Sequence, residues 1–181
     1  MMVKGSIVAL VTPFNEDGSV NLEKIGELIE YHIANKTDGI VLLGTTAESP
    51  TLTFEEEEQI LEYAVKKAAG RIFLIAGSGS NCTQTAVERS AAYSQTGVDA
   101  LLVITPYYNR TNTSGMIKHF TQIADVSKVP IILYNVPGRT GCNISEEAVA
   151  VLSKHPNIKA IKEASGNISY LAIVAKYLND D

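Results

Sequence analysis

The 181 residues of this chain, 45% of them hydrophobic, are enough for one domain with a real apolar core. A net charge of −5, with no block of lysine and arginine, argues against a general binder of nucleic acid or of a membrane surface. The two cysteines, Cys82 and Cys142, are too few and too far apart for a disulfide framework or a zinc site, so we expect a cytoplasmic protein with reduced thiols.

Short runs of β-branched and other apolar residues alternate with helical patterns along the whole chain. The first run is ended by Pro13 and is too short for a signal peptide core or a transmembrane span. The starts of the runs recur at intervals of about 30 residues, close to the length of one strand-helix unit. We predict strands at residues 6–10, 39–43, 72–76, 100–104, 131–134 and 158–161.

The segments between these strands carry apolar residues at helical spacing, as in Leu22, Ile25, Ile29 and Ile33. Capping signals mark several helix starts. Thr53 and Glu56 form a capping box, Asn81 and Gln84 resemble one, and Ser145 is placed to cap a further helix.

Strands that are apolar throughout are covered on both faces, which indicates a parallel sheet. Strict alternation of strands and helices then leaves two architectures, a doubly wound sheet or a (β/α)8 barrel. Six strand-helix units would complete a doubly wound sheet, whereas a (β/α)8 barrel would lack two of its units. No linker is visible, so we expect one domain over residues 1–181.

In both architectures the chemistry belongs at the C-terminal ends of the strands, and polar residues gather there. The segments that follow the second to sixth strands include Thr45 and Thr46, Gly77-x-Gly79, Tyr107 and Tyr108, Tyr134 and Arg139, and Lys162.

Lys162 ends an apolar strand, and burial of an unpaired ammonium is unfavourable. In one interpretation it pairs with Glu163 or reaches the surface, as most lysines do. In the other it is desolvated, has a lowered pKa, keeps a free amine and attacks a carbonyl to form a Schiff base.

The other tips have structural and functional interpretations as well. Thr45 and Thr46 are suited equally to turn formation and to holding a carboxylate. Tyr134 is placed to enter the same mouth as Lys162, and Arg139, with no acidic neighbour in sequence, suits bidentate binding of a carboxylate. Tyr107 and Tyr108 fit packing or interface positions.

Several common site types are not indicated. Gly77-x-Gly79 lacks the third glycine of a dinucleotide fingerprint and suits a tight turn. No cluster of acidic, histidine or cysteine residues forms a metal site at the tips. We expect His32, His119 and His155 to be surface or partly packed residues, with no catalytic triad.

One amine, several hydroxyls and an arginine fit imine chemistry on an oxo-acid. The alternative from another class is a doubly wound binding module without covalent chemistry.

Four motifs, in order, carry a specific resemblance that extends from Ser6 to the end of the chain. The sequence resembles the dihydrodipicolinate synthase family, a branch of the class I pyruvate-dependent aldolases that include N-acetylneuraminate lyase. The motifs are Gly44-Thr45-Thr46-x-Glu48-Ser49, Pro106-Tyr107-Tyr108-Asn109, Tyr134-Asn135-Val136-Pro137-x-Arg139-Thr140-Gly141 and Ile161-Lys162-Glu163-Ala164-x-Gly166-Asn167.

The resemblance implies a (β/α)8 barrel enzyme of lysine and diaminopimelate biosynthesis. It would condense pyruvate with aspartate semialdehyde through a Schiff base on Lys162, with no metal or organic cofactor. Tyr134, Thr46 and Tyr108 would move protons, and Tyr108 would reach a neighbouring subunit of a homotetramer built as a dimer of dimers. Thr45 and Thr46 would hold pyruvate, and Arg139 the semialdehyde. A sister aldolase acting on another oxo-acid is the nearest alternative.

Three departures from the family pattern carry expectations. Ala47 replaces a usual glycine, which would strain the loop by about 1 kcal/mol if that position has positive φ. Phe54, Glu57 and Thr85 replace residues that bind inhibitory lysine in regulated members, so we expect weak or absent lysine inhibition. The chain also ends before the two further βα units and the C-terminal helical domain of the family.

Overall fold

Six parallel strands form the centre of the structure, and each is hydrogen-bonded to the strand that precedes it in the chain. The computed structural model describes residues 4–177. The strands are β1 (Ile7–Ala9), β2 (Gly39–Leu42), β3 (Phe73–Gly77), β4 (Ala100–Ile104), β5 (Ile131–Asn135) and β6 (Ile158–Glu163).

The strand order decides between the two predicted architectures. A doubly wound sheet reverses its direction of growth at a switch point, whereas a barrel adds strands in one sense only. The observed order runs from β1 to β6 without reversal. The chain therefore forms a half-barrel, which matches the first part of a (β/α)8 barrel.

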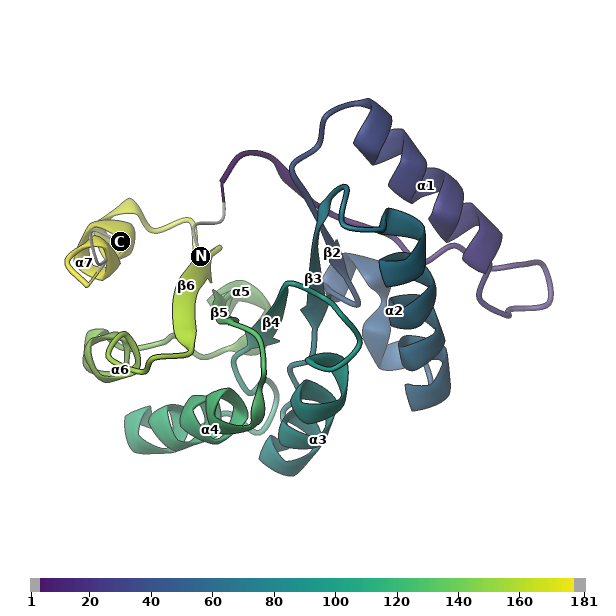
Figure 1. Cartoon of the computed structure of the whole chain (residues 1–181). Coiled ribbons are helices and arrows are strands. Elements are labelled where there is room, and N and C mark those ends of the chain that lie inside the picture. The colour runs from purple at the N-terminus through teal and green to yellow at the C-terminus, as the bar shows by residue number, and fades with distance from the viewer. Residues whose placement is uncertain (1–3, 178–181) are drawn as a thin grey trace.

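The helices α1 to α4, α6 and α7 lie along the outside of this curved sheet, where Figure 1 shows them as an arc, whereas the short α5 lies inside the arc, beside β5. The longer ones are α1 (Leu22–Ala34), α2 (Phe54–Ala68), α3 (Thr83–Tyr93) and α4 (Thr113–Val126). The shorter ones are α5 (Pro137–Thr140), α6 (Glu146–Leu152), α7 (Ile168–Ala175) and the 3-10 turns η1 (Thr45–Ala47) and η2 (Ser49–Thr51).

The two faces of the sheet have separate cores. The larger core lies between the sheet and the helices, and includes Leu42, Leu74, Leu133 and Ile158 from the strands. A smaller cluster covers the inner face of the half-barrel and consists of Val41, Ile75, Ala100, Leu102, Ile132, Tyr134 and Val136. Because side chains alternate along a strand, the residue next to each inner one faces the helices.

The pairing of β5 with β6 contains one irregularity that fixes which side chains meet at the strand tips. Ile131 pairs with Ile158, but Ile132 pairs with Ala160, so Lys159 is an extra residue in β6. Without this bulge Tyr134 would pair with Ile161, whereas it pairs with Lys162. The bulge thus places the lysine beside the tyrosine on the inner face.

The predicted strands all exist, and the largest boundary difference concerns the last one. The strand at residues 100–104 is confirmed, and β6 continues to Glu163, two residues beyond its predicted end. The capping box at Thr53 and the cap at Ser145 are also confirmed. The cap predicted at Asn81 is wrong, because α3 begins after Cys82, whose side chain makes no capping bond.

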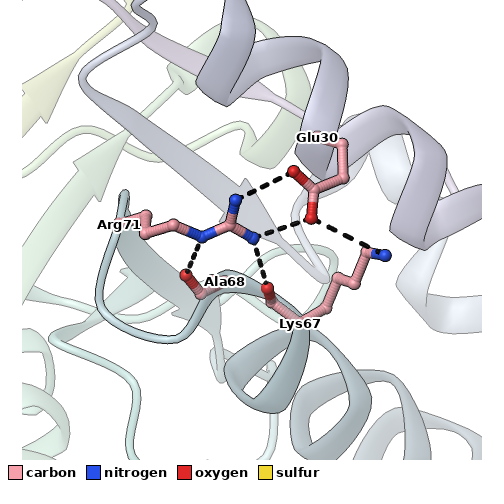
Figure 2. A network of polar contacts seen from close by, with 4 residues as sticks. All are labelled: Glu30, Lys67, Ala68 and Arg71. Carbon is pink, nitrogen blue, oxygen red and sulfur yellow. Dashed lines mark hydrogen bonds and ion pairs between the residues drawn. The ribbon is translucent and has the colours of Figure 1, made fainter.

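A network of charged groups joins α1 to the C-terminal end of α2 (Figure 2). Arg71 donates two hydrogen bonds to the carboxylate of Glu30, at 2.7 and 2.9 Å, and two more to the carbonyls of Lys67 and Ala68. The carbonyls at a helix C-terminus lack partners within the helix, and the guanidinium supplies them. These contacts tie the first two strand-helix units together.

His119 is the one histidine whose predicted place is wrong, because it is buried in α4 with an exposed fraction of only 3%. Its Nδ1 lies 2.9 Å from the Thr83 hydroxyl, and its ring packs edge-on against Phe120. Burial lowers the pKa of His119 to about 4. The apolar spacing of α4 places position 119 on the face of the helix that packs against the core. The prediction went wrong because histidine is a polar residue type and was assigned to the surface on that ground.

None of the helices within residues 4–177 combines the length and the apolar character that a membrane crossing requires.

The depressed pKa of His119 predicts acid sensitivity. The histidine titrates near 6.5 when the chain is unfolded and near 4 when it is folded, so the unfolded state binds the proton first. The contribution of neutral His119 to the free energy of unfolding is fully present above pH 6.5. About 3 kcal/mol of that free energy is lost as the pH falls toward 4. Urea titrations of the protein and of His119→Asn between pH 4 and pH 7.5 measure this. The variant should lose less stability over that range, and parallel curves would contradict the assignment.

Candidate active site

An open cavity of about 580 Å³ lies at the C-terminal ends of the strands. Its floor is the inner face of the half-barrel, with Val41, Leu102 and Ile104 among the lining residues. The polar residues that line it are Thr45, Thr46, Glu48, Ser49, Thr51, Arg89, Tyr107, Tyr134, Arg139, Thr140 and Lys162. The structure therefore brings together five of the six predicted site residues, all except Tyr108.

A second cavity, of about 540 Å³, is formed by residues of α6, β6 and the end of α7. It contains none of the predicted site residues and lacks the convergence of hydroxyl groups found at the strand tips. We therefore take the first cavity as the candidate active site.

Lys162 and Tyr134 form the centre of this site. Their strand positions pair directly, and Lys162 Nζ lies 4.3 Å from the centroid of the Tyr134 ring. Tyr134 itself is buried, with 8% of its surface exposed. The ring therefore forms a rigid wall against which the amine rests.

The lysine forms no ion pair with a carboxylate among the described residues, so pairing with Glu163, the first form of the structural interpretation, is wrong, whereas the exposure of Lys162 to solvent agrees with its second form. Glu163 occupies the opposite face of β6 and bonds elsewhere. Partial desolvation of the amine lowers the pKa of Lys162 below that of an ordinary lysine. Water still reaches the residue from the open side of the half-barrel, so the amine is accessible.

Thr45 and Thr46 lie at the tip of β2, in the turn η1, where both are exposed to the cavity. Ala47 follows them with its side chain buried, and its carbonyl accepts a 2.8 Å hydrogen bond from Thr12. Positive φ occurs at Glu48, not at Ala47, so the strain expected from alanine is absent. The alanine is accommodated without cost to the threonine loop.

The glycine at the tip of β3 has a packing role. A Cβ atom on Gly77 would lie 2.1 Å from the carbonyl oxygen of Leu43, a distance that no side chain could accept. Only glycine lets the loop after β2 cross so closely over β3. This supports the interpretation of Gly77-x-Gly79 as a tight turn and explains how the threonine loop comes to overhang the cavity.

Arg139 lies on α5, the short helix that follows β5, and reaches the rim of the cavity. Within residues 4–177 its side chain forms no ion pair with a carboxylate. An exposed guanidinium without an acidic partner keeps its donors available for an anion.

Tyr107 lines the cavity, whereas Tyr108 points away from it and is 91% exposed. The backbone holds this orientation through left-handed φ angles of 64° at Tyr108 and 52° at Arg110, a conformation that costs about 1 kcal/mol or more per residue. In the part of the chain described, no hydrogen bond links Thr46 to Tyr134 or to Tyr108. The proton relay implied by the family resemblance stays a prediction.

One wall of the cavity was not anticipated from the sequence. Arg89 of α3 lines it, and its Nε lies 3.0 Å from the carboxylate of Glu57, which also accepts a hydrogen bond from Tyr93. Glu57 is 1% exposed, and its burial raises the pKa of the carboxyl group despite these two partners. Phe54 stacks on Tyr93 and covers the cluster. Glu57 is the buried member of a run of four glutamates at the start of α2, and the sequence alone does not distinguish it from its neighbours.

Two further residues belong to the site through their contacts. Asn135 and Glu163 follow Tyr134 and Lys162 directly, and their side chains are hydrogen-bonded to each other on the outer face of the sheet. Sequence alternation could have placed them there, since each is one position from an inner residue.

No group of three acidic, histidine or cysteine residues suited to a metal ion occurs within residues 4–177.

Comparison with known proteins yields one consistent family. Residues 2–181 match the model of the dihydrodipicolinate synthetase family. A 4-hydroxy-tetrahydrodipicolinate synthase of Thermoanaerobacter sp. (strain X514) is 54% identical over 176 residues, covering 97% of this chain and 59% of the relative. The chain thus spans about three fifths of the length of this relative.

Solved structures agree with the sequence comparison. The dihydrodipicolinate synthase of Aquifex aeolicus superposes with a TM-score of 0.94 at 47% identity, covering 98% of this chain and 61% of that one. The chloride-inhibited dihydrodipicolinate synthase of Acinetobacter baumannii, complexed with pyruvate, gives 0.93 at 40% identity, with 98% and 62% covered. With its half-barrel, its cavity at the strand tips and these matches, the chain belongs to the dihydrodipicolinate synthetase family.

Proposed function

We propose that this chain carries the imine-forming part of a 4-hydroxy-tetrahydrodipicolinate synthase, which condenses pyruvate with L-aspartate 4-semialdehyde. The observation that carries the proposal is the Lys162 amine resting against Tyr134, without an acidic partner within residues 4–177, in a cavity that also holds Thr45, Thr46 and Arg139. The relatives' names and the pyruvate complex of the Acinetobacter baumannii enzyme support it.

The reaction begins at the lysine. The unprotonated Nζ attacks the ketone carbon of pyruvate, and the resulting carbinolamine loses water to give an imine. Loss of a proton from the methyl group then gives an enamine, whose carbon attacks the aldehyde of the semialdehyde. The amino group of that substrate attacks the imine carbon in turn, closes the ring and releases the lysine.

The remaining residues have roles set by their positions. The Tyr134 phenol lies beside the amine and moves protons as the carbinolamine forms and collapses. Thr45 and Thr46 hold the carboxylate of pyruvate, and Thr46 links Tyr134 to Tyr108 of a neighbouring subunit. Arg139 binds the carboxylate of the semialdehyde at the rim. No metal or organic cofactor takes part.

The same proposal includes the surroundings of the site. Two further βα units and a C-terminal helical domain, within the two fifths of the relatives' length that lie outside the match, would close the barrel over the open side of the cavity. The exposed Tyr108 supports assembly as a dimer of dimers. The two free cysteines support a cytoplasmic location.

Borohydride trapping tests the central claim. With pyruvate present, reduction should add one pyruvate-derived group to Lys162, detected by peptide mass spectrometry, and Lys162→Arg should remove it. Because desolvation lowers the pKa of Lys162, the trapping rate should begin to fall at a lower pH than the reaction of an exposed lysine such as Lys159 does. The assay is run on this chain and on a form extended to the relatives' length. The proposal is falsified if neither form gives the adduct.

Replacement of Arg139 tests the second substrate. Arg139→Ala removes a charged, bidentate partner and should lower kcat/KM for the semialdehyde by about 100-fold. Pyruvate adduct formation on Lys162 should be unaffected, which separates this effect from misfolding. Equal kcat/KM values in the variant and the parent would favour a sister aldolase that acts on a different aldehyde.

Lysine inhibition should be weak or absent. Glu57 is buried and its Oε2 already contacts both Tyr93 and Arg89, while Phe54 is stacked on Tyr93, so an incoming ammonium would have to compete with Arg89 for a carboxylate that is closed off from solvent. Initial rates with and without lysine at about 1 mM measure the effect. Half-maximal inhibition below that concentration would show the expectation to be wrong.

A further inference from the structure

A polar cluster lies directly behind the lysine, on the outer face of β5 and β6. Asn135 is completely buried at the tip of β5, and its side chain uses both of its donors and one acceptor position. Its Nδ2 donates to Glu163 and to Asn143, both at 2.7 Å, and its Oδ1 accepts from the backbone of Ile144 at 3.0 Å.

Glu163 acts in this cluster as an acceptor at both oxygens. Oε2 accepts from Asn135, and Oε1 accepts from the backbone N–H of Ser165. Each carboxylate oxygen thus faces one N–H donor. An amide in this place would have only one acceptor oxygen and would leave one of the two donors facing an NH2 group.

The cluster also holds the segments on either side. The hydroxyl of Tyr170 on α7 donates to the carbonyl of Ile144 at 2.6 Å. Desolvation, with a contribution from the charge of Glu163, raises the pKa of Tyr170 to about 12, so the phenol stays a donor. The backbone N–H of Ala164 donates to the carbonyl of Asn135 and extends the ladder beyond the strand.

The other end of β6 is anchored as well. Asn157 Nδ2 donates to the carbonyls of Ala124, Ser127 and Val129, at 2.9 to 3.2 Å, just before the strand begins. The bulge at Lys159 lies between the two anchors. A strand with one extra residue can slip by one position to remove it, and such a slip would turn Lys162 away from Tyr134.

We propose that Asn135 and Glu163 form a register clamp that positions Lys162 against Tyr134 for attack on the oxo-acid. The clamp touches neither the substrate nor the amine, and acts through the strand: Asn135 pairs with Glu163 in the same register in which Tyr134 pairs with Lys162. The two pairs alternate across the sheet, so the outer bond holds only when the inner contact is also in place. This proposal rests on the proposed imine chemistry.

A donor-acceptor exchange tests the clamp. Asn135→Asp places two carboxylates face to face, and Glu163→Gln brings two amide donors together. The double variant restores a donor facing an acceptor between positions 135 and 163 in the reverse direction, with the Gln oxygen still available to Ser165 and the Asp oxygen to Ile144, and Asn143 regains its contact by turning its amide so that Nδ2 donates to the Asp. Glu147→Gln, on the exposed first turn of α6, is the matched control.

The first readout is the rate of borohydride-trapped adduct at saturating pyruvate. The trapping rate of each single variant should fall at least about tenfold, as expected when the nucleophile is misplaced by a fraction of an ångström. The pyruvate concentration that gives half of the maximal rate should be nearly unchanged. The double variant should recover to within about threefold of the parent. A role in stability alone would lower the melting temperature of the single variants and leave the trapping rate of the folded protein intact, which would overturn the proposal.

A second readout needs no pyruvate and separates this proposal from the proposed function. Trinitrobenzenesulfonate labels free amines, and the ratio of labelling at Lys162 to that at Lys159 reports on the site directly. The ratio should fall several-fold in both single variants and return in the double variant, even if the parent forms no pyruvate adduct. An unchanged ratio in the single variants would reject the clamp whatever the adduct assay gives.

Discussion

The contact between Lys162 and Tyr134 at the centre of the site depends on the register between β5 and β6. One extra residue in β6 sets the inner-facing lysine opposite the inner-facing tyrosine. A shift by a single position would send Lys162 to the helix-covered face, where an ammonium has no partner and would displace apolar contacts. The register is thus both the condition for the chemistry and a condition for a well-packed outer core.

At the C-terminal ends of β5 and β6, the side chains on the two faces of the sheet differ in their hydrogen bonding. On the inner face Tyr134 and Lys162 are left without side-chain hydrogen bonds to the described residues, free to meet a substrate. On the outer face Asn135 and Glu163 are saturated with them. A reactive group that must stay unpaired needs its position fixed by something else, and here its chain neighbours supply that.

The sequence was sufficient for the parts of the fold that depend on local pattern. Apolar runs predicted all six strands, and their tips predicted where the polar residues would meet. The register shift at Lys159 was not predictable, because a bulge depends on pairing with a distant strand. His119 and Glu57 were misjudged or overlooked for a related reason: tertiary packing buried two residues whose types are usually exposed.

Two of the three cations that line the cavity form no ion pair with the described residues. Arg89 is held by Glu57, whereas Lys162 and Arg139 have no such partner within residues 4–177. Glu48 also lines the cavity but forms an ion pair with neither of them. An acidic chain with a net charge of −5 thus has, at one cavity, two cations that form no ion pair with the described residues. Low-dielectric walls focus such a field, which attracts small anions. If the proposed function is correct, selection of an anionic oxo-acid would begin before any covalent step, with charge placed by the same strand ends that place the nucleophile.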